Sequence, residues 1–137
     1  AECPGTRFVL DHCGNPDLKC FRPRRIGEDA AAHTEDTLKR LIYALASRPN
    51  VICKISGVAA GLRPEGGAED LAPAVNHCLD AFGPNRVAFG GDWPVCLLGT
   101  TYQKLVRMLR EIVASRPQTH QRLLWSGNAL RQYGLHV

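Results

Sequence analysis

The stretch Arg86–Cys96, RVAFGGDWPVC, decides the fold prediction for this chain of 137 residues. Its first half is nearly continuously apolar, which is typical of a strand that is covered on both faces. Period-two alternation places Ala88 and Gly90 on the same face as Asp92. Asp92 therefore stands at the point where a buried strand ends. An aspartate in this position also fits a cap of the following turn, and the stretch alone favours neither interpretation.

Two further apolar runs predict strands, and helical patterns lie between and after the strands. The predicted strands are Phe8–Leu10, Val51–Ser56 and Arg86–Gly91. The predicted helices are Thr34–Arg48, Glu69–Phe82, Tyr102–Ser115 and Asn128–Tyr133, with a turn at Gln118–Leu124. The first helix has apolar residues at i, i+3, i+4 and i+7 spacing, namely Leu38, Leu41, Ile42 and Leu45. This order of elements predicts an α/β fold built from consecutive βαβ units with parallel strands.

The number of strands is too small for a closed barrel. A β/α barrel needs about eight βα units and ~250 residues. The sequence also opens on AECPGTRFVL, so an apolar strand comes almost at once. We expect the chain to be part of a larger barrel, and a processed N-terminus is the alternative interpretation.

Composition and charge exclude several classes of protein. The hydrophobic fraction of 45% and the charged fraction of 22% are typical of a globular protein, and no run approaches the ~20 apolar residues of a membrane span. The basic residues are scattered except for Arg22, Arg24 and Arg25, which we interpret as a solvated loop. We therefore expect neither nucleic acid nor membrane as a partner.

The chain has six cysteines, and no pair has the C-x-x-C spacing of a zinc or redox motif. We expect free, mostly buried thiols and a cytoplasmic location, because disulfides are rare in reducing compartments. Cys13 and Cys96 flank the ends of two predicted strands. We interpret both as inert buried thiols and not as nucleophiles.

Three other polar or aromatic residues accompany Asp92 as candidates. His12 ends the first predicted strand, and an imidazole there can carry a proton or donate to a developing oxyanion, with a structural histidine as the alternative. Because parallel strand ends converge, we expect His12 close to Asp92. Lys54 lies inside a strand, where it either contacts substrate near Asp92 or extends to solvent from the edge. Trp93 either lines a substrate pocket or packs. The absence of H-x-H and H-E-x-x-H predicts no metal ligand.

Four motifs resemble the amidohydrolase-related family, in its lactone-hydrolysing branch of fuconolactonases and pyrone-dicarboxylate lactonases. They are FVLDHCGNP (residues 8–16), PNVICKISG (49–57), FGPNRVAFGGDWPVC (82–96) and GNALRQYGL (127–135). The resemblance implies that residues 1–137 are the C-terminal portion of a β/α barrel, carrying its sixth to eighth strands. It also implies that Asp92 is the general base on the hydrolytic water and that His12 polarises the lactone carbonyl. Lys54 matches a lysine of the K-x-S-G motif, without an assigned role.

The resemblance further implies a hydrolase that opens a small lactone or cyclic ester. The family's first strand carries an H-x-H pair that this chain lacks, so we expect no required cofactor, with a divalent metal such as zinc as the alternative. Two other functions stay open. One is a catalytically incomplete fragment that needs a partner half or associates with itself. The other is a decarboxylase relative, which the Asp-Trp-Pro-Val sequence after the last strand disfavours.

Overall fold

The three strands form one parallel sheet in the order β1–β2–β3. The structure is a computed structural model that describes residues 3–135. The strands are β1 (Phe8–Leu10), β2 (Val51–Ile55) and β3 (Val87–Phe89). Leu10 lies opposite Cys53, and Cys53 lies opposite Val87. The predicted α/β class with parallel strands is confirmed, and the second and third strands are shorter than predicted.

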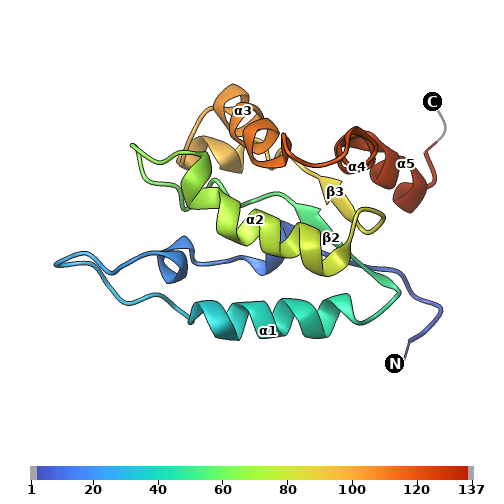
Figure 1. Ribbon diagram of the computed structural model, residues 1–137, viewed down its shortest axis with the longest axis horizontal. Coiled ribbons are helices and arrows are strands. Elements are labelled where there is room, and N and C mark those ends of the chain that lie inside the picture. The colour runs from blue at the N-terminus through green and yellow to red at the C-terminus, as the bar shows by residue number, and fades with distance from the viewer. Residues whose placement is uncertain (1–2, 136–137) are drawn as a thin grey trace.

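The helices follow the strands and pack side by side along the sheet (Figure 1). They are α1 (Glu35–Ala46), α2 (Ala68–Phe82), α3 (Tyr102–Val113), α4 (Gln118–Arg122) and α5 (Asn128–Tyr133). Short 3-10 turns at Asp11–Gly14, Leu18–Phe21 and Val95–Leu98 and a π turn at Leu123–Gly127 complete the elements. Within residues 3–135, no helix has the length and apolar character needed to cross a membrane.

The predicted turn at Gln118–Leu124 is wrong, because this segment is helical. Pro117 directly precedes α4, and its ring fixes φ at a value that suits the start of a helix. Between Pro117 and Gly127 no glycine or proline interrupts the chain. The helical backbone therefore continues from α4 through the π turn into α5, which begins at Asn128 as predicted.

Helix α1 begins one residue later than predicted because Thr34 is its cap. The Thr34 side chain accepts a hydrogen bond from the backbone N–H of Thr37, at 3.1 Å. The predicted apolar stripe is only half covered by the described residues. Leu38 and Ile42 are buried, whereas Leu41 is 50% exposed and Leu45 is 38% exposed.

The core lies between the helices and the side of the sheet that faces α2. Cys53 and Val87 point to this side from neighbouring positions on β2 and β3 and are buried in the core. The residues next to Cys53 and Val87, which are Lys54 and Ala88, point to the opposite side. The cysteines are free, and four of them are buried, which confirms that part of the prediction: Cys13, Cys53, Cys78 and Cys96.

Candidate active site

His12 and Asp92 meet at the carboxyl edge of the sheet. His12 follows β1 and Asp92 comes after β3, and parallel strands bring their carboxyl ends to one edge. The Nε2 atom of His12 lies 3.9 Å from Oδ1 of Asp92, and the two side chains are 33% and 18% exposed. The structure thus places these residues together, as the sequence predicted, in a position that a small molecule can reach. We call this edge the mouth of the sheet.

The backbone at the mouth has an unusual conformation. His12 has a φ of 56° and Asp92 a φ of 50°, so both lie in the left-handed region. Few residues other than glycine adopt this region, although aspartate and histidine tolerate it better than most. Strained backbone of this kind gathers at functional sites, where the surrounding structure holds it in place. The conformation therefore supports a functional interpretation of both residues over that of a simple turn cap.

Ser56 holds the imidazole of His12 from the end of the middle strand. Its Oγ atom lies 2.9 Å from Nδ1 of His12, and the serine is buried. If Oγ donates this hydrogen bond, the ring carries its proton on Nε2, which faces Asp92. Gly57 has a φ of 66°, and a Cβ there would lie 2.5 Å from the ring. Ser56 therefore orients the imidazole, and Gly57 leaves room for it.

Ser56 was not among the candidate residues predicted from the sequence. The available signal was its position, since it is a small polar residue that ends the strand between those of His12 and Asp92. Neither composition nor helical or strand periodicity distinguishes such a serine from one in an ordinary turn. Its contact with His12 joins residues 44 positions apart, and that contact exists only in the folded chain.

Lys54 lies at the mouth, but it is paired with Asp11. Its Nζ atom is 2.6 Å from Oδ1 of Asp11, and its side chain is 27% exposed. The side chain extends past Gly90, where an added Cβ would lie 3.2 Å from Cε of Lys54 and 3.0 Å from Cβ of Ser56. The missing side chain at Gly90 thus gives Lys54 and Ser56 their space. A contact of Lys54 with substrate remains a prediction, and the ion pair satisfies the charge within the strand.

Trp93 stands at the rim of the mouth and is 70% exposed. It is not packed into the core, so its indole is available to a ligand, and its role in binding remains a prediction. Gly91, two residues before Trp93, packs closely against the ring of Tyr102. A Cβ on Gly91 would be 2.4 Å from that ring. The sequence interpretation did not select Tyr102, which begins α3.

The donor atoms at the mouth do not complete a zinc site. Catalytic zinc is held by three protein ligands and a water molecule. The mouth supplies the imidazole of His12 and the carboxylate of Asp92. Among residues 3–135, the group of three or more donors close enough for one ion lies elsewhere, and it consists of Cys13, Cys53 and Cys78. A zinc ion at the mouth would need ligands from outside the described residues.

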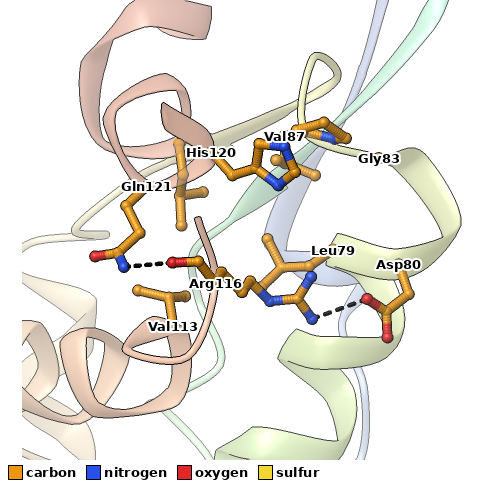
Figure 2. A pocket seen from close by; sticks show the side chains of 10 residues that line it. Leu79, Asp80, Gly83, Val87, Val113, Arg116, His120 and Gln121 are labelled. Carbon is orange, nitrogen blue, oxygen red and sulfur yellow. Dashed lines mark hydrogen bonds and ion pairs between the residues drawn. The ribbon is translucent and has the colours of Figure 1, made fainter. Parts of the chain in front are cut away.

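A second hollow lies at the amino end of β3, between α2 and α4 (Figure 2). It has a volume of about 170 Å³ and includes Val87, the first residue of the strand. The side chain of Arg116 donates to the carboxylate of Asp80 at 2.9 Å, so these two charged groups are already paired. The side-chain amide of Gln121 donates to the backbone carbonyl of Arg116 at 2.9 Å. Chemistry in α/β folds gathers at the carboxyl ends of the strands. We therefore assign the candidate site to the mouth.

Comparisons with known proteins agree with this assignment. A family model described as amidohydrolase matches residues 1–135. An L-fucono-1,5-lactonase of Burkholderia multivorans is 38% identical over 93% of this chain and 43% of its own length. A crystal structure of an amidohydrolase from Burkholderia multivorans with bound zinc has a TM-score of 0.79 and 32% identity, and the match covers 96% of this chain and 45% of that one.

A more distant structure shares the fold. The amidohydrolase 2 of Bifidobacterium longum subsp. infantis has a TM-score of 0.64 at 22% identity, over 98% of this chain and 43% of that chain. The chain thus spans less than half the length of the relatives that it matches, as expected for three βα units of a larger barrel. The family model, the lactonase relative and the shared fold lead to the same conclusion: this chain belongs to the amidohydrolase family, which is a family of hydrolases.

Proposed function

We propose that the chain supplies the Asp92 side of an active site that opens a small lactone or a similar cyclic ester. The observation that carries this proposal is the pair of His12 and Asp92, with 3.9 Å between Nε2 and Oδ1, at the carboxyl edge of a parallel sheet. The substrate class is supported by the L-fucono-1,5-lactonase that is 38% identical to this chain. The three strands would be the sixth, seventh and eighth of a complete barrel.

Asp92 acts as the general base in this proposal. A separation of 3.9 Å is too long for a direct hydrogen bond between His12 and Asp92. The gap leaves room for a water molecule that donates a hydrogen bond to Oδ1 of Asp92, so the single proton on Nε2 of His12 stays available. Asp92 takes a proton from this water while the water oxygen forms a bond to the carbonyl carbon of the lactone. The position of the carboxylate beside a held imidazole favours this role over that of a turn cap.

His12 stabilises the charge that develops on the carbonyl oxygen. With Ser56 donating to Nδ1, the Nε2–H group faces the mouth and donates a hydrogen bond to that oxygen. When the tetrahedral intermediate collapses, the ring C–O bond breaks and the leaving oxygen takes the proton held by Asp92. The product is the open-chain hydroxy acid. Asp92 is thereby returned to its ionised form for the next turnover.

The test is the Asp92→Asn variant, studied in the protein that contains the complete barrel. Asparagine tolerates the left-handed backbone of this position, so the fold is retained while the base is lost. We expect turnover of lactone substrates to fall about 10²–10⁴-fold, the usual contribution of a general base, without a change in the unfolding midpoint. Ring opening is followed by titration of the acid that is released.

A matched control is Asp80→Asn, which removes an exposed carboxylate of α2 outside the mouth. This variant should keep full turnover. If Asp92→Asn hydrolyses lactones as fast as the control, the assignment of the base is wrong. Release of carbon dioxide in place of ring opening, on a panel of substrates, would instead indicate the decarboxylase function.

A second candidate is that this chain acts as one half of a split or larger site. An apolar groove lined by Leu10 and by the exposed side of α1, including Leu41 and Leu45, lies beside the outer edge of β1. In a barrel the preceding βα unit would cover this groove. We infer that a partner half, or a second copy, covers it in a complete particle. Size-exclusion chromatography and urea unfolding test this, and a cooperative monomer of the isolated chain would contradict it.

A further inference from the structure

Three cysteine thiols meet beneath the mouth, in the core between the sheet and α2. Cys13 follows β1, Cys53 lies in β2, and Cys78 lies in α2. Their sulfur atoms all lie within 4.8 Å of one another. The residues are 1%, 0% and 2% exposed, so the group has no access to solvent in the folded chain. This cluster is separate from the pair of His12 and Asp92, although Cys13 is the next residue after His12.

The spacing of the sulfur atoms suits one metal ion in a three-coordinate site. At a metal–sulfur distance of about 2.3 Å, three sulfur atoms in a plane around an ion are about 4.0 Å apart. The observed limit of 4.8 Å exceeds this value by less than about 1 Å, so small side-chain rotations close the site. No carboxylate or imidazole of the described residues belongs to the group. Soft thiolates bind both zinc and monovalent copper, but a structural zinc site takes a fourth ligand, so a group of three sulfur atoms favours copper(I).

Binding of an ion changes the protonation of the cluster. The thiolate and not the thiol is the metal ligand, so an ion held by three sulfur atoms displaces the protons of the cysteines.

We infer that Cys13, Cys53 and Cys78 form a site for one soft monovalent metal ion, copper(I), bound by three sulfur atoms. The ion would join the segment after β1, the middle strand and α2. Because Cys13 is bonded to His12, the ion also holds the backbone that carries the imidazole.

The test uses the reduced, metal-free protein that contains the complete barrel, in the absence of oxygen. Copper(I) is offered as its coloured complex with bathocuproine disulfonate, and loss of colour measures the copper that the protein withdraws. We expect one equivalent of copper per chain. X-ray absorption should then count three sulfur neighbours at about 2.3 Å. Bound copper should raise the Tm of the chain, because the ligand binds the folded state.

Serine variants of the three cysteines should each lower the affinity for copper(I). Removal of an outer-shell partner lowers metal affinity by roughly 10–100-fold. Removal of a direct ligand should lower the affinity for copper(I) by more than this. Cys96→Ser is the matched control, because Cys96 is equally buried but lies outside the group. The control should bind copper like the unchanged chain. Circular dichroism of each metal-free variant is recorded first, and Cys78→Ala replaces Cys78→Ser if the serine variant does not fold.

Four results would overturn the inference. The first is that the chain withdraws no copper. The second is that Cys96→Ser weakens binding as much as the variants of the cluster do. The third is X-ray absorption that finds fewer than three sulfur neighbours, a measurement on the unchanged chain that does not depend on any variant folding. The fourth is that a serine variant of the cluster binds copper(I) as tightly as the unchanged chain does.

Discussion

The two ends of the sheet use polar side chains in opposite ways. At the amino end, the side-chain amide of Asn128 is buried and donates to the backbone carbonyls of Pro84 and Val87, both at 2.7 Å. At the carboxyl end, the side chains of His12, Ser56 and Asp92 face one another. The first arrangement satisfies backbone acceptors. The second leaves an imidazole and a carboxylate available to a ligand.

The backbone differs in the same way. Asn128 lies in regular helical backbone, whereas His12 and Asp92 have positive φ. A side chain that closes backbone hydrogen bonds contributes to stability, and a side chain held in strained backbone contributes to function at some cost in stability. The comparison therefore predicts that variants of the amino end change unfolding without changing chemistry. Variants of the mouth should do the reverse.

The largest expected effect on stability comes from Asn128→Ala. The change removes the donor from the buried carbonyl of Val87 and from the partly buried carbonyl of Pro84, and we expect a loss of about 2–4 kcal/mol in the free energy of unfolding. Urea unfolding measures this loss. Asn85→Ala, an exposed residue of the same region, should change stability by less than about 0.5 kcal/mol. The comparison fails if the folded fraction of Asn128→Ala has reduced turnover in the complete barrel.

Gly57→Ala should affect both properties. Its φ of 66° strains an alanine by about 1–2 kcal/mol, and the new methyl group would displace the ring of His12. We expect a lower unfolding midpoint together with reduced turnover. Gly61→Ala is the control in the same loop, because a Cβ there meets no atom within 4 Å. Unchanged turnover in Gly57→Ala would show that the position of the imidazole does not matter.

Ser56→Ala should affect chemistry with a smaller change in stability. Loss of one hydrogen bond, worth about 1 kcal/mol, releases the imidazole, and we expect kcat to fall roughly tenfold while KM changes little. Steady-state kinetics of the complete barrel separate the two constants. Ser47→Ala, beyond the end of α1, serves as the control. A rise in KM with unchanged kcat would contradict a positioning role for Ser56.

The smallest effect is expected at Arg22, outside both ends of the sheet. The guanidinium pairs with Glu28, and this hydrogen bond lowers the pKa of Glu28 to about 2 from an ordinary value of 4.5. Because the pKa is lower in the folded chain, the stabilisation is complete above pH 4.5 and is lost as the pH falls to about 2. Arg22→Gln should thus lower the urea midpoint slightly at pH 7 and converge with the unchanged chain in acid.

Arg40→Gln is the control for this titration, because Arg40 is exposed on α1. This variant also removes one positive charge. Its urea midpoint should differ from that of the unchanged chain by an amount that does not depend on the ionisation of Glu28. If Arg22→Gln and Arg40→Gln follow the same curve between pH 7 and 2, the ion pair contributes nothing beyond net charge. The partly basic loop would then be simply solvated, as the sequence interpretation expected for all three of its arginines.

Local patterns in the sequence were sufficient for the elements and for two of the mouth residues. Apolar runs and helix signals located the three strands and the main helices within a few residues, because these depend on neighbours along the chain. Alternation of strand and helix implied a parallel sheet, and a parallel sheet implies one edge where His12 and Asp92 converge. The convergence therefore followed from chain order before any contact was known.

The contacts between distant segments could not be derived in this way. Lys54 lies at the mouth, but no pattern along the chain predicts its ion pair with Asp11. The cysteines were interpreted one by one as inert thiols, and the fold gathers three of them within 4.8 Å. The stripe of α1 was predicted as one buried face, and the described residues cover only the half that contains Leu38 and Ile42. Each outcome depends on which segments pack together.

By itself, then, the sequence determined the order and type of the elements, the edge of the sheet at which His12 and Asp92 meet, and the choice of these two residues as candidates. The tertiary structure decided which neighbours those residues have: Ser56 behind the imidazole, and a cluster of thiols beneath it. The physical reason is the range of the interactions. Helix and strand patterns repeat over a few residues, whereas the contact of Ser56 with His12 joins residues 44 positions apart.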